Sequence, residues 1–305
     1  MLKLTLRQLD ILEAVARCGN FSRASAELHL SQPAVSMQIK QLEDSLGLPL
    51  FEHLGRRIHL TAAGQETLQA SRAISRQLSN LETALADLRG LQGGTLTVSV
   101  ASTATYFTAR LMALFRQVHP DVKISLNVVN RETILQHFAE NSIDLALMGQ
   151  PPEGSDLEAQ SFMENPLVII AAPTHPLAEM HDIPLARLAE ETFIGREQGS
   201  GTRSAVEKLF EAKGLTFKAA MEMNKNEAIK QAVESGLGLG VVSLHTVQAE
   251  LATHSLCVLD VQGFPLLRRW YLVQREGKRL SPAARAFTQF VLSEAARIGS
   301  TDKAG

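Results

Sequence analysis

Apolar residues in the first 60 positions recur at intervals of three and four, which is the spacing of one face of an α-helix. The capping-box sequence Thr5-Leu6-Arg7-Gln8 marks the start of a first helix, and Gly19-Asn20 marks its end. We expect a second, short helix over residues 22–28, capped by Ser22, and a third helix between Ser31 and Gly47. The pattern therefore predicts a small unit built on three helices.

The third helix has two faces of different character. Its apolar positions, which fall within one narrow arc, are Val35, Ile39, Leu42 and Leu46. The opposite side is mostly polar and carries Gln32, Pro33, Ser36, Met37 and Lys40. We expect the apolar face to pack on the other helices and the polar face to be available to a partner.

Residues 48–51 and 56–60 flank His53-Leu54-Gly55 and predict a hairpin, or wing, with Arg56 and Arg57 at its tip. A short helix, a turn and an exposed helix match a helix-turn-helix, whose second helix enters the DNA major groove. Gln side chains pair with adenine edges, Ser contacts bases or phosphates, and Lys and Arg bind phosphates. The candidate DNA contacts are therefore Arg23, Gln32, Pro33, Ser36, Lys40, Arg56 and Arg57.

A small helical bundle whose polar face only meets water is the competing interpretation of these three helices. Residues 1–65 contain seven Lys/Arg against six Asp/Glu, so their net charge is only +1. DNA binding would then depend on local placement of charge and on helix N-termini more than on a broad positive field.

A long helix is predicted over residues 61–89, where no proline occurs. Its apolar residues at alternating steps of four and three, which are heptad positions, are Ile74, Leu78, Leu81, Leu85 and Leu88. So narrow an apolar seam needs a partner helix, and self-association is the simplest source of one. Gly90 and Gly93-Gly94 then mark a linker.

Strand and helix patterns alternate from residue 95 to the end. Strands are expected at 96–100, 122–129, 143–148, 167–171, 193–194, 217–223, 239–242 and 267–274, and helices at 104–118, 132–140, 202–213, 227–235 and 282–295. Such alternation favours mainly parallel α/β sheets, and the number of elements favours two lobes with a ligand cleft between them.

Composition fits a cytoplasmic protein. The chain has 305 residues, more than one hydrophobic core normally serves, and 45% of them are hydrophobic. We find neither a signal peptide nor an apolar run long enough for a membrane span, and we expect no membrane partner. The two cysteines, Cys18 and Cys257, are too few for a disulfide framework.

Several of these segments together resemble the winged helix-turn-helix of LysR-type transcriptional regulators. The segments are Phe21-Ser-Arg-Ala-Ser-Ala-Glu-Leu28, Ser31-Gln-Pro-Ala-Val-Ser36, Gln41-Leu-Glu43, Gly47, Leu50-Phe51 and Leu60-Thr61. The resemblance implies an α+β multidomain chain with an all-α winged helix-turn-helix domain and a long dimerisation helix. A two-lobed α/β effector domain of the type II periplasmic-binding-protein fold follows.

On this resemblance the DNA-binding domain spans residues 1–60, the dimerisation helix 61–90 and the effector domain 91–305. Lobe I would hold residues 91–161 and 266–305, and lobe II residues 162–265, with crossovers near Phe162 and Phe264. The resemblance also implies double-stranded DNA with an interrupted palindromic operator as a partner. It further implies a homodimer that pairs into a tetramer, and contact with RNA polymerase.

Further segments are most similar to regulators of Calvin-cycle (RuBisCO) operons. They are Asn130-Arg-Glu-Thr133, Asp144-Leu-Ala-Leu-Met-Gly149, Arg196-Glu-Gln-Gly-Ser-Gly-Thr-Arg203, Asn226-Glu-Ala-Ile-Lys-Gln-Ala-Val233 and Leu280-Ser-Pro282. The effector implied is a small anionic metabolite, either a phosphorylated intermediate or an anion like NADPH or ATP. A LysR-type regulator of another regulon, which senses a different organic anion, is the alternative.

The cleft residues follow from two helix starts. Small residues precede a helix at Gly199-Ser-Gly-Thr-Arg203, and Ser102-Thr103 lies between a strand and a helix, so free N–H groups and hydroxyls would face an anion. Ordinary capping, with Thr202 as N-cap, explains the same pattern, and the resemblance favours the ligand. The effector-binding candidates are Ser102, Thr103, Thr133, Gly149, Arg196, Ser200, Gly201, Thr202, Arg203 and Asn226.

An enzyme with an accessory DNA-binding domain is the alternative from another class. The nine histidines are scattered without metal-ligand spacing, and neither a nucleophile elbow nor a phosphate-binding loop that ends in Gly-Lys-Ser/Thr is found. We therefore expect no enzyme activity, no metal and no cofactor.

Overall fold

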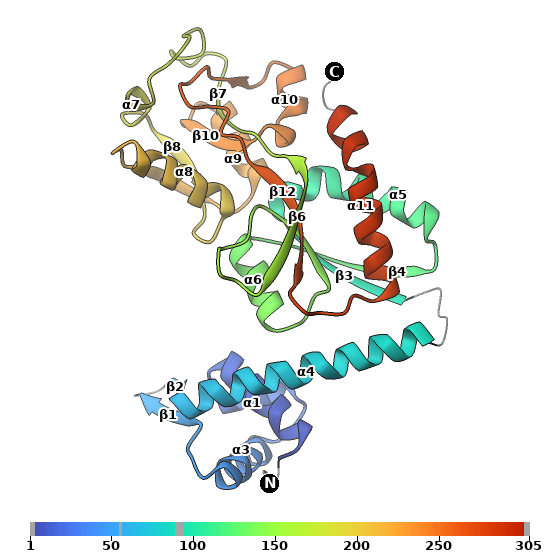
Figure 1. Cartoon of the computed structure of the whole chain (residues 1–305). Helices are drawn as coiled ribbons and strands as arrows, with labels where there is room; N and C mark the ends of the chain where they lie inside the picture. The colour runs from blue at the N-terminus through green and yellow to red at the C-terminus, as the bar shows by residue number, and fades with distance from the viewer. Residues whose placement is uncertain (1–3, 55–56, 89–93, 302–305) are drawn as a thin grey trace. The chain divides into compact units, whose positions relative to one another are not determined.

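The structure, a computed structural model, describes residues 4–54, 57–88 and 94–301. The chain forms two compact units, Met1–Glu82 and Thr83–Gly305 (Figure 1). The first unit contains α1 (Leu6–Cys18), α2 (Phe21–Glu27), α3 (Gln32–Leu46), β1 (Phe51–Leu54), β2 (Arg57–Leu60) and most of α4 (Ala62–Leu88).

Local capping signals set the helix starts of the first unit. The Thr5 hydroxyl accepts the Gln8 N–H, and the Gln8 side chain accepts the Thr5 N–H, which confirms the predicted capping box. The predicted cap of the second helix was wrong, because Asn20 occupies the N-cap position and its Oδ1 accepts the N–H groups of Ser22 and Arg23. Asn20 therefore begins the second helix, whereas the sequence pattern had assigned it to the end of the first.

The apolar face of α3 packs inward as predicted. Val35, Ile39 and Leu42 are buried in one core with side chains of α1, and Leu46 is partly buried beside them. The wing is tied to this helix, because the Glu43 carboxylate accepts the N–H of Leu50 at 2.7 Å. The hairpin therefore starts from a fixed point on α3, with β1 and β2 paired antiparallel.

The second unit has two sheets of five strands each. One sheet has the order β4-β3-β5-β12-β6 and the other β11-β7-β10-β8-β9. In the first lobe the strands are β3 (Gly94–Ala101), β4 (Val122–Val129), β5 (Leu145–Met148), β6 (Leu157–Glu164) and β12 (Arg269–Arg275). In the second they are β7 (Leu167–Ala171), β8 (Phe193–Arg196), β9 (Ala219–Met223), β10 (Leu239–Ser243) and β11 (Cys257–Val258).

Helices cover both sheets. They are α5 (Thr105–Val118), α6 (Arg131–Ala139), α7 (Leu185–Leu188), α8 (Gly201–Ala212), α9 (Asn226–Glu234), α10 (Gln248–Ala252) and α11 (Pro282–Thr301), with 3-10 turns η1 (Ser102–Ala104) and η2 (Leu244–Thr246). Figure 1 shows α11 beside α5 on the first lobe, where Phe115 and Phe287 pack edge to face.

The expectation of mainly parallel sheets was wrong for part of each lobe. β12 runs antiparallel to β5 and β6, and β7 runs antiparallel to β10 and β11, whereas β3-β4-β5 and β8-β9-β10 are parallel. The antiparallel strands are the ones that lead into and out of the crossovers between lobes. β6 was not predicted, because this edge strand is mostly polar and exposed.

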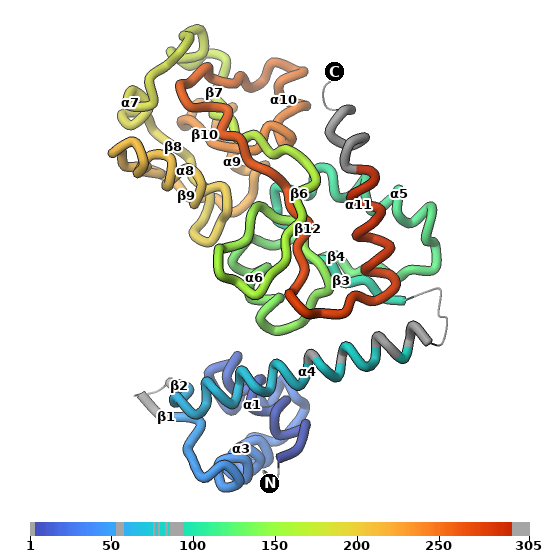
Figure 2. The backbone as a smooth tube through the Cα atoms, in the orientation of Figure 1, coloured from blue at the N-terminus to red at the C-terminus, as the bar shows by residue number. Residues whose placement is uncertain are grey.

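The two crossovers between the lobes run side by side (Figure 2). Leu167 and Leu266 exchange both backbone hydrogen bonds, and the Asn165 N–H donates to the Arg268 carbonyl at 2.8 Å. Phe162, near which the first crossover was expected, is buried in the first lobe within β6, so the crossover follows it. The paired segments form a two-stranded connection that also brings Asn165 and Arg268 together.

Candidate functional site

A pocket opens between the two lobes where parallel strands of the first lobe end. It encloses about 390 Å³ outside the protein atoms, part of which is open to solvent. Ser102 follows β3, Asn130 and Arg131 follow β4, and Gly149 follows β5, so the carboxyl ends of three neighbouring strands face it. This is the position at which open α/β sheets bind ligands.

Most of the predicted effector residues lie around this pocket. Those that line it are Ser102, Thr103, Gly149, Arg196, Ser200, Gly201 and Thr202. Thr133 and Asn226 line a neighbouring, wider pocket that shares Ser102 and Asn130 with the first. Arg203 lines neither of these two pockets.

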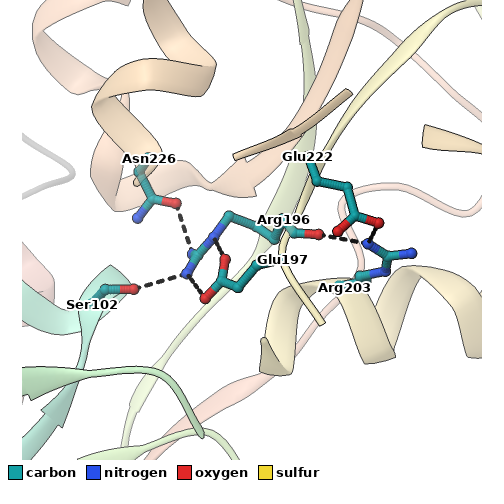
Figure 3. A network of polar contacts seen from close by, with 6 residues as sticks. All are labelled: Ser102, Arg196, Glu197, Arg203, Glu222 and Asn226. Carbon is teal, nitrogen blue, oxygen red and sulfur yellow. Dashed lines mark hydrogen bonds and ion pairs between the residues drawn. The ribbon is translucent and has the colours of Figure 1, made fainter. Parts of the chain in front are cut away.

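Arg196 forms a polar bridge between the lobes (Figure 3). Only 4% of this residue is exposed, and its guanidinium donates to Ser102 Oγ of the first lobe and to Asn226 Oδ1 of the second, both at 3.0 Å. The neighbouring Glu197 carboxylate accepts two further hydrogen bonds from it. Because a carboxylate already neutralises Arg196, this residue joins the lobes more than it supplies free positive charge to the pocket.

Arg203 has a supporting position instead of the predicted place in the cleft. Its guanidinium pairs with Glu207. It also pairs with Glu222 and donates to the Arg196 carbonyl at 3.0 Å (Figure 3). The pKa of Arg203 is raised, chiefly by the hydrogen bond to Glu207. The Arg203 side chain therefore fixes the backbone of Arg196, through the hydrogen bond to its carbonyl.

Two arginines that were not predicted supply the free positive charge of the pocket. Arg131 and Arg268 both line it, and their guanidinium groups donate to the backbone carbonyls of Gln150 and Gly201, respectively. Burial lowers the pKa of both groups, and Arg131 lowers the pKa of Arg268 further. Among the described residues no carboxylate forms an ion pair with either guanidinium. The two positive charges repel each other, and an anion bound between them would relieve this repulsion.

The start of α8 faces the same pocket. Ser200 occupies the N-cap position, which the alternative capping interpretation gave to Thr202, and its side chain makes no capping hydrogen bond. The first N–H groups of α8 are therefore left without a side-chain cap beside Gly201 and Thr202, which line the pocket. Uncapped N–H groups with the positive end of a helix dipole favour an anion.

Gly149 is small because Arg268 occupies the adjoining space. A Cβ atom added at Gly149 would lie 2.7 Å from Arg268 Nη2. We predict that Gly149→Ala displaces this guanidinium and weakens binding of the proposed anion about tenfold, the equivalent of one weakened charged hydrogen bond. Calorimetric titration measures the affinity, and equal affinities of the wild type and the variant would contradict this role of Gly149.

The helix-turn-helix surface is largely exposed. Arg23, Gln32, Pro33 and Lys40 are exposed, and Ser36 is half-buried and accepts a hydrogen bond from Gln32 Nε2 at 2.9 Å. The predicted contact Arg56 lies outside the described residues, as does the side chain of Arg57.

Met37 adds an apolar element to this surface. The residue is 53% exposed on the same helix as Gln32 and Lys40. An exposed apolar side chain among polar ones suits contact with a thymine methyl group in the major groove.

Across residues 4–54, 57–88 and 94–301, no group of three or more His, Cys, Asp or Glu side chains is placed to hold a metal ion. No helix among the same residues is both long and apolar enough to cross a membrane.

A winged helix-turn-helix joined by a long helix to a two-lobed domain with a cationic cleft defines a DNA-binding regulator with a ligand-binding domain. Residues 6–65 match the family described as "Bacterial regulatory helix-turn-helix protein, lysR family", and residues 89–296 match "LysR substrate binding domain". The chain belongs to the LysR family of transcriptional regulators. It is accordingly a transcription regulator and not an enzyme.

Similar proteins cover nearly the full chain. A RuBisCO operon transcriptional regulator from Allochromatium vinosum is 58% identical over 294 residues, which are 96% of this chain and 97% of that protein. The HTH-type transcriptional activator CmpR from Synechocystis is 45% identical over 289 residues, 95% of each chain.

Two solved structures show the same folds. The regulatory domain of CcmR from Synechocystis PCC6803, in complex with 2-PG, is 42% identical with a TM-score of 0.64, and the match covers 66% of this chain and 97% of that one. A full-length variant of OxyR from Pseudomonas aeruginosa is 22% identical with a TM-score of 0.69, over 97% of this chain and 95% of that one. The second likeness concerns the fold alone.

Proposed function

We propose that this protein controls transcription of Calvin-cycle (RuBisCO) genes in response to a small phosphorylated anion bound between the lobes of its effector domain. The relatives support the choice of genes, because RuBisCO operon regulators are 58% and 46% identical to the chain over nearly its full length. The 2-PG bound to the CcmR regulatory domain supports the choice of ligand class.

The proposal for an anion rests on the presence of two like charges, Arg131 and Arg268, in one pocket. Two partly buried guanidinium groups that repel each other are costly in an empty pocket and favourable around a phosphate or carboxylate. Guanidinium presents planar, paired donors that suit these groups. The uncapped start of α8 faces the same space and adds further donors.

Calorimetric titration tests the ligand proposal directly. The purified protein would be titrated with 2-phosphoglycolate, ribulose bisphosphate, phosphoenolpyruvate, ATP and NADPH. We expect at least one of these anions to bind with one site per chain, and lactate of equal concentration not to bind. Failure of every phosphorylated anion would overturn the choice of ligand, and binding of a carboxylate alone would move the chain to a regulator of other genes.

For the DNA partner, we infer that α3 enters the major groove of an operator and that Arg23 and Lys40 contact its phosphates. Gln32 and Ser36 would contact base edges, with Pro33 at the helix start and Arg56 and Arg57 on the wing. Two such DNA-binding domains related by two-fold symmetry would bind an interrupted palindrome. We extend the proposal to a dimer that pairs into a tetramer, to contact with RNA polymerase, and to a cytoplasmic location.

The α4 seam supports dimerisation. Ile74, Leu78, Leu81 and Leu85 are all exposed on one helix at heptad spacing, and Leu81 is 54% exposed. We predict that Leu81→Asp converts dimers to monomers at micromolar concentration, because an unpaired carboxylate in an apolar seam is costly. Sedimentation equilibrium of the full chain measures the change.

Gln69→Asp is the matched control for this variant, since Gln69 is exposed on α4 away from the apolar seam. It should sediment like the wild type. A Leu81→Asp protein that remains fully dimeric at low concentration would show that these leucines do not form the interface.

A further inference from the structure

Besides Arg131 Nε of the two arginines described above, two buried polar atoms of residues that line the pocket between the lobes have no hydrogen-bond partner. Asn165 is 3% exposed and its Oδ1 is unpaired, and Trp270 is 1% exposed and its indole Nε1 is unpaired. One of these atoms is an acceptor and the other a donor. Buried polar atoms without a partner are rare, and in a ligand pocket they indicate what the ligand supplies.

Both residues are buried and held in place by their surroundings. The Asn165 N–H donates to the Arg268 carbonyl at 2.8 Å, which fixes the residue in the paired crossover segments. The Trp270 ring packs edge to face on Phe107, with 5.5 Å between ring centroids. Residues 270 and 163 pair across β12 and β6, and Asn165 follows two residues later on the same chain. Both side chains are thus held in neighbouring segments of one sheet edge.

The chemistry of this pair differs from that of the two arginines. Arg131 and Arg268 donate only, so they match the oxygens of an ionised phosphate or carboxylate. Those oxygens accept only, and they would leave Asn165 Oδ1 without a donor. A hydroxyl group both donates and accepts, so it has the hydrogen-bonding chemistry that Asn165 Oδ1 and Trp270 Nε1 lack.

We propose that the anion bound in this pocket carries a hydroxyl group, which donates to Asn165 Oδ1 and accepts from Trp270 Nε1. The inference rests on the proposed anion site and names its ligand more narrowly, as a hydroxylated phosphorylated acid or sugar phosphate. A site built around a hydroxyl discriminates against the ligand that lacks it, because its own buried polar atoms then remain unpaired.

A matched ligand pair tests the proposal. 3-Phosphoglycerate and 3-phosphonooxypropanoate have the same phosphate and carboxylate and differ only in the hydroxyl at C2. In calorimetric titrations the wild type is expected to bind the hydroxylated compound at least tenfold more tightly. Trp270 is the only tryptophan of the chain, so its fluorescence gives a second readout at the site itself.

Two variants separate the pair from the rest of the pocket. Asn165→Leu removes Oδ1 together with the amide nitrogen, and Trp270→Phe removes the indole N–H. Each should bring the ratio of the two affinities close to one while binding of the phosphate persists. Asn127→Leu on β4, away from the pocket lining, is the control and should keep the wild-type ratio. Thermal melts establish whether each variant is folded. If only one of the two is folded, that variant alone tests the proposal.

The outcomes also distinguish this inference from the proposed function. Equal affinities of the two compounds for the wild type would overturn the hydroxyl and leave the anion site intact. An affinity ratio that both variants preserve would assign the discrimination to other residues and overturn the roles of Asn165 and Trp270. If neither compound binds, and no anion of the wider panel binds either, both proposals fail.

Discussion

The double variant Arg131→Met, Arg268→Met is expected to lose anion binding by a factor of about 100 or more. Each substitution removes a partly buried guanidinium that lines the pocket, and a charged hydrogen bond is worth about 1.5 to 3 kcal/mol. Two such losses correspond to at least about two powers of ten in affinity. Calorimetric titration with the anion that binds the wild type best measures the effect.

Folding of this double variant should be affected little. Burial and the nearby Arg131 charge already lower the pKa of Arg268, so removal of both charges relieves an unfavourable interaction in the free protein. Lys208→Met, on the exposed side of α8, removes a positive charge from the same unit without touching the pocket and is the control. Anion binding by the double variant at wild-type strength would show that the ligand lies elsewhere.

A triple variant of the recognition helix, Gln32→Ala, Ser36→Ala, Lys40→Ala, is expected to weaken specific DNA binding about 100-fold. A good base contact discriminates between bases by about 1 to 3 kcal/mol. Gln32 and Ser36 lie on the face of α3 opposite its core, where they can make such contacts. Lys40→Ala alone should weaken binding to all sequences equally and reduce the salt slope by about one. Fluorescence anisotropy with operator DNA at several salt concentrations separates the two effects.

The triple variant should fold normally, because the core of the first unit does not depend on the three substituted side chains. Val35, Ile39 and Leu42 supply the buried face of α3, so the three substituted side chains contribute little to packing. Ser45→Ala, exposed in the last turn of α3, is the control and should bind DNA normally. A folded triple variant with unchanged affinity for operator DNA would remove α3 from the DNA interface.

The sequence predicted the first unit well because its signals are local. Thr5 and Gln8 cap one helix within a single turn, and the inward face of α3 follows from helical spacing alone. The error at Ser22 has the same local origin, because Asn20 and Ser22 are both good N-caps and only the backbone decides between them.

The sequence predicted the pocket in part, because strand ends indicate where a ligand binds but not which charges are free. Arg196 and Arg203 stand in a segment rich in small residues, and both are paired with carboxylates. Glu222, which binds Arg203, lies 19 residues away along the chain and reaches it through the pairing of β8 with β9. Tertiary contacts of this kind leave no periodic pattern.

The free arginines were missed for different reasons. Arg131 follows β4 as the first residue of α6, so the rule that selected Ser102 after β3 would also have selected it. Arg268 lies in the second crossover, and its place in the pocket depends on the pairing of that segment with Asn165. No local signal marks such a position before the crossovers are known.

Hydrogen bonds join the two lobes, and these are the contacts that a ligand in the pocket can alter. Ser102 accepts a hydrogen bond from Arg196, and the Glu132 N–H donates to the Gly199 carbonyl, so groups of the first lobe contact groups of the second lobe at two places. An anion changes the regulator only through a difference in its affinity for two lobe arrangements. The linker predicted at Gly90 and Gly93-Gly94 falls mostly within residues 89–93, which lie outside the described part of the chain.

The most direct test of the account is the affinity of the full-length protein for DNA upstream of a RuBisCO operon, with and without a saturating anion shown by calorimetry to bind. We predict a change in affinity of about 5-fold to 150-fold for the wild type, the usual range of allosteric coupling, and no change for the Arg131→Met, Arg268→Met variant. By linkage, the DNA should alter the affinity for the anion by the same factor. An anion that saturates the wild-type protein and leaves its DNA affinity and footprint unchanged would contradict the account.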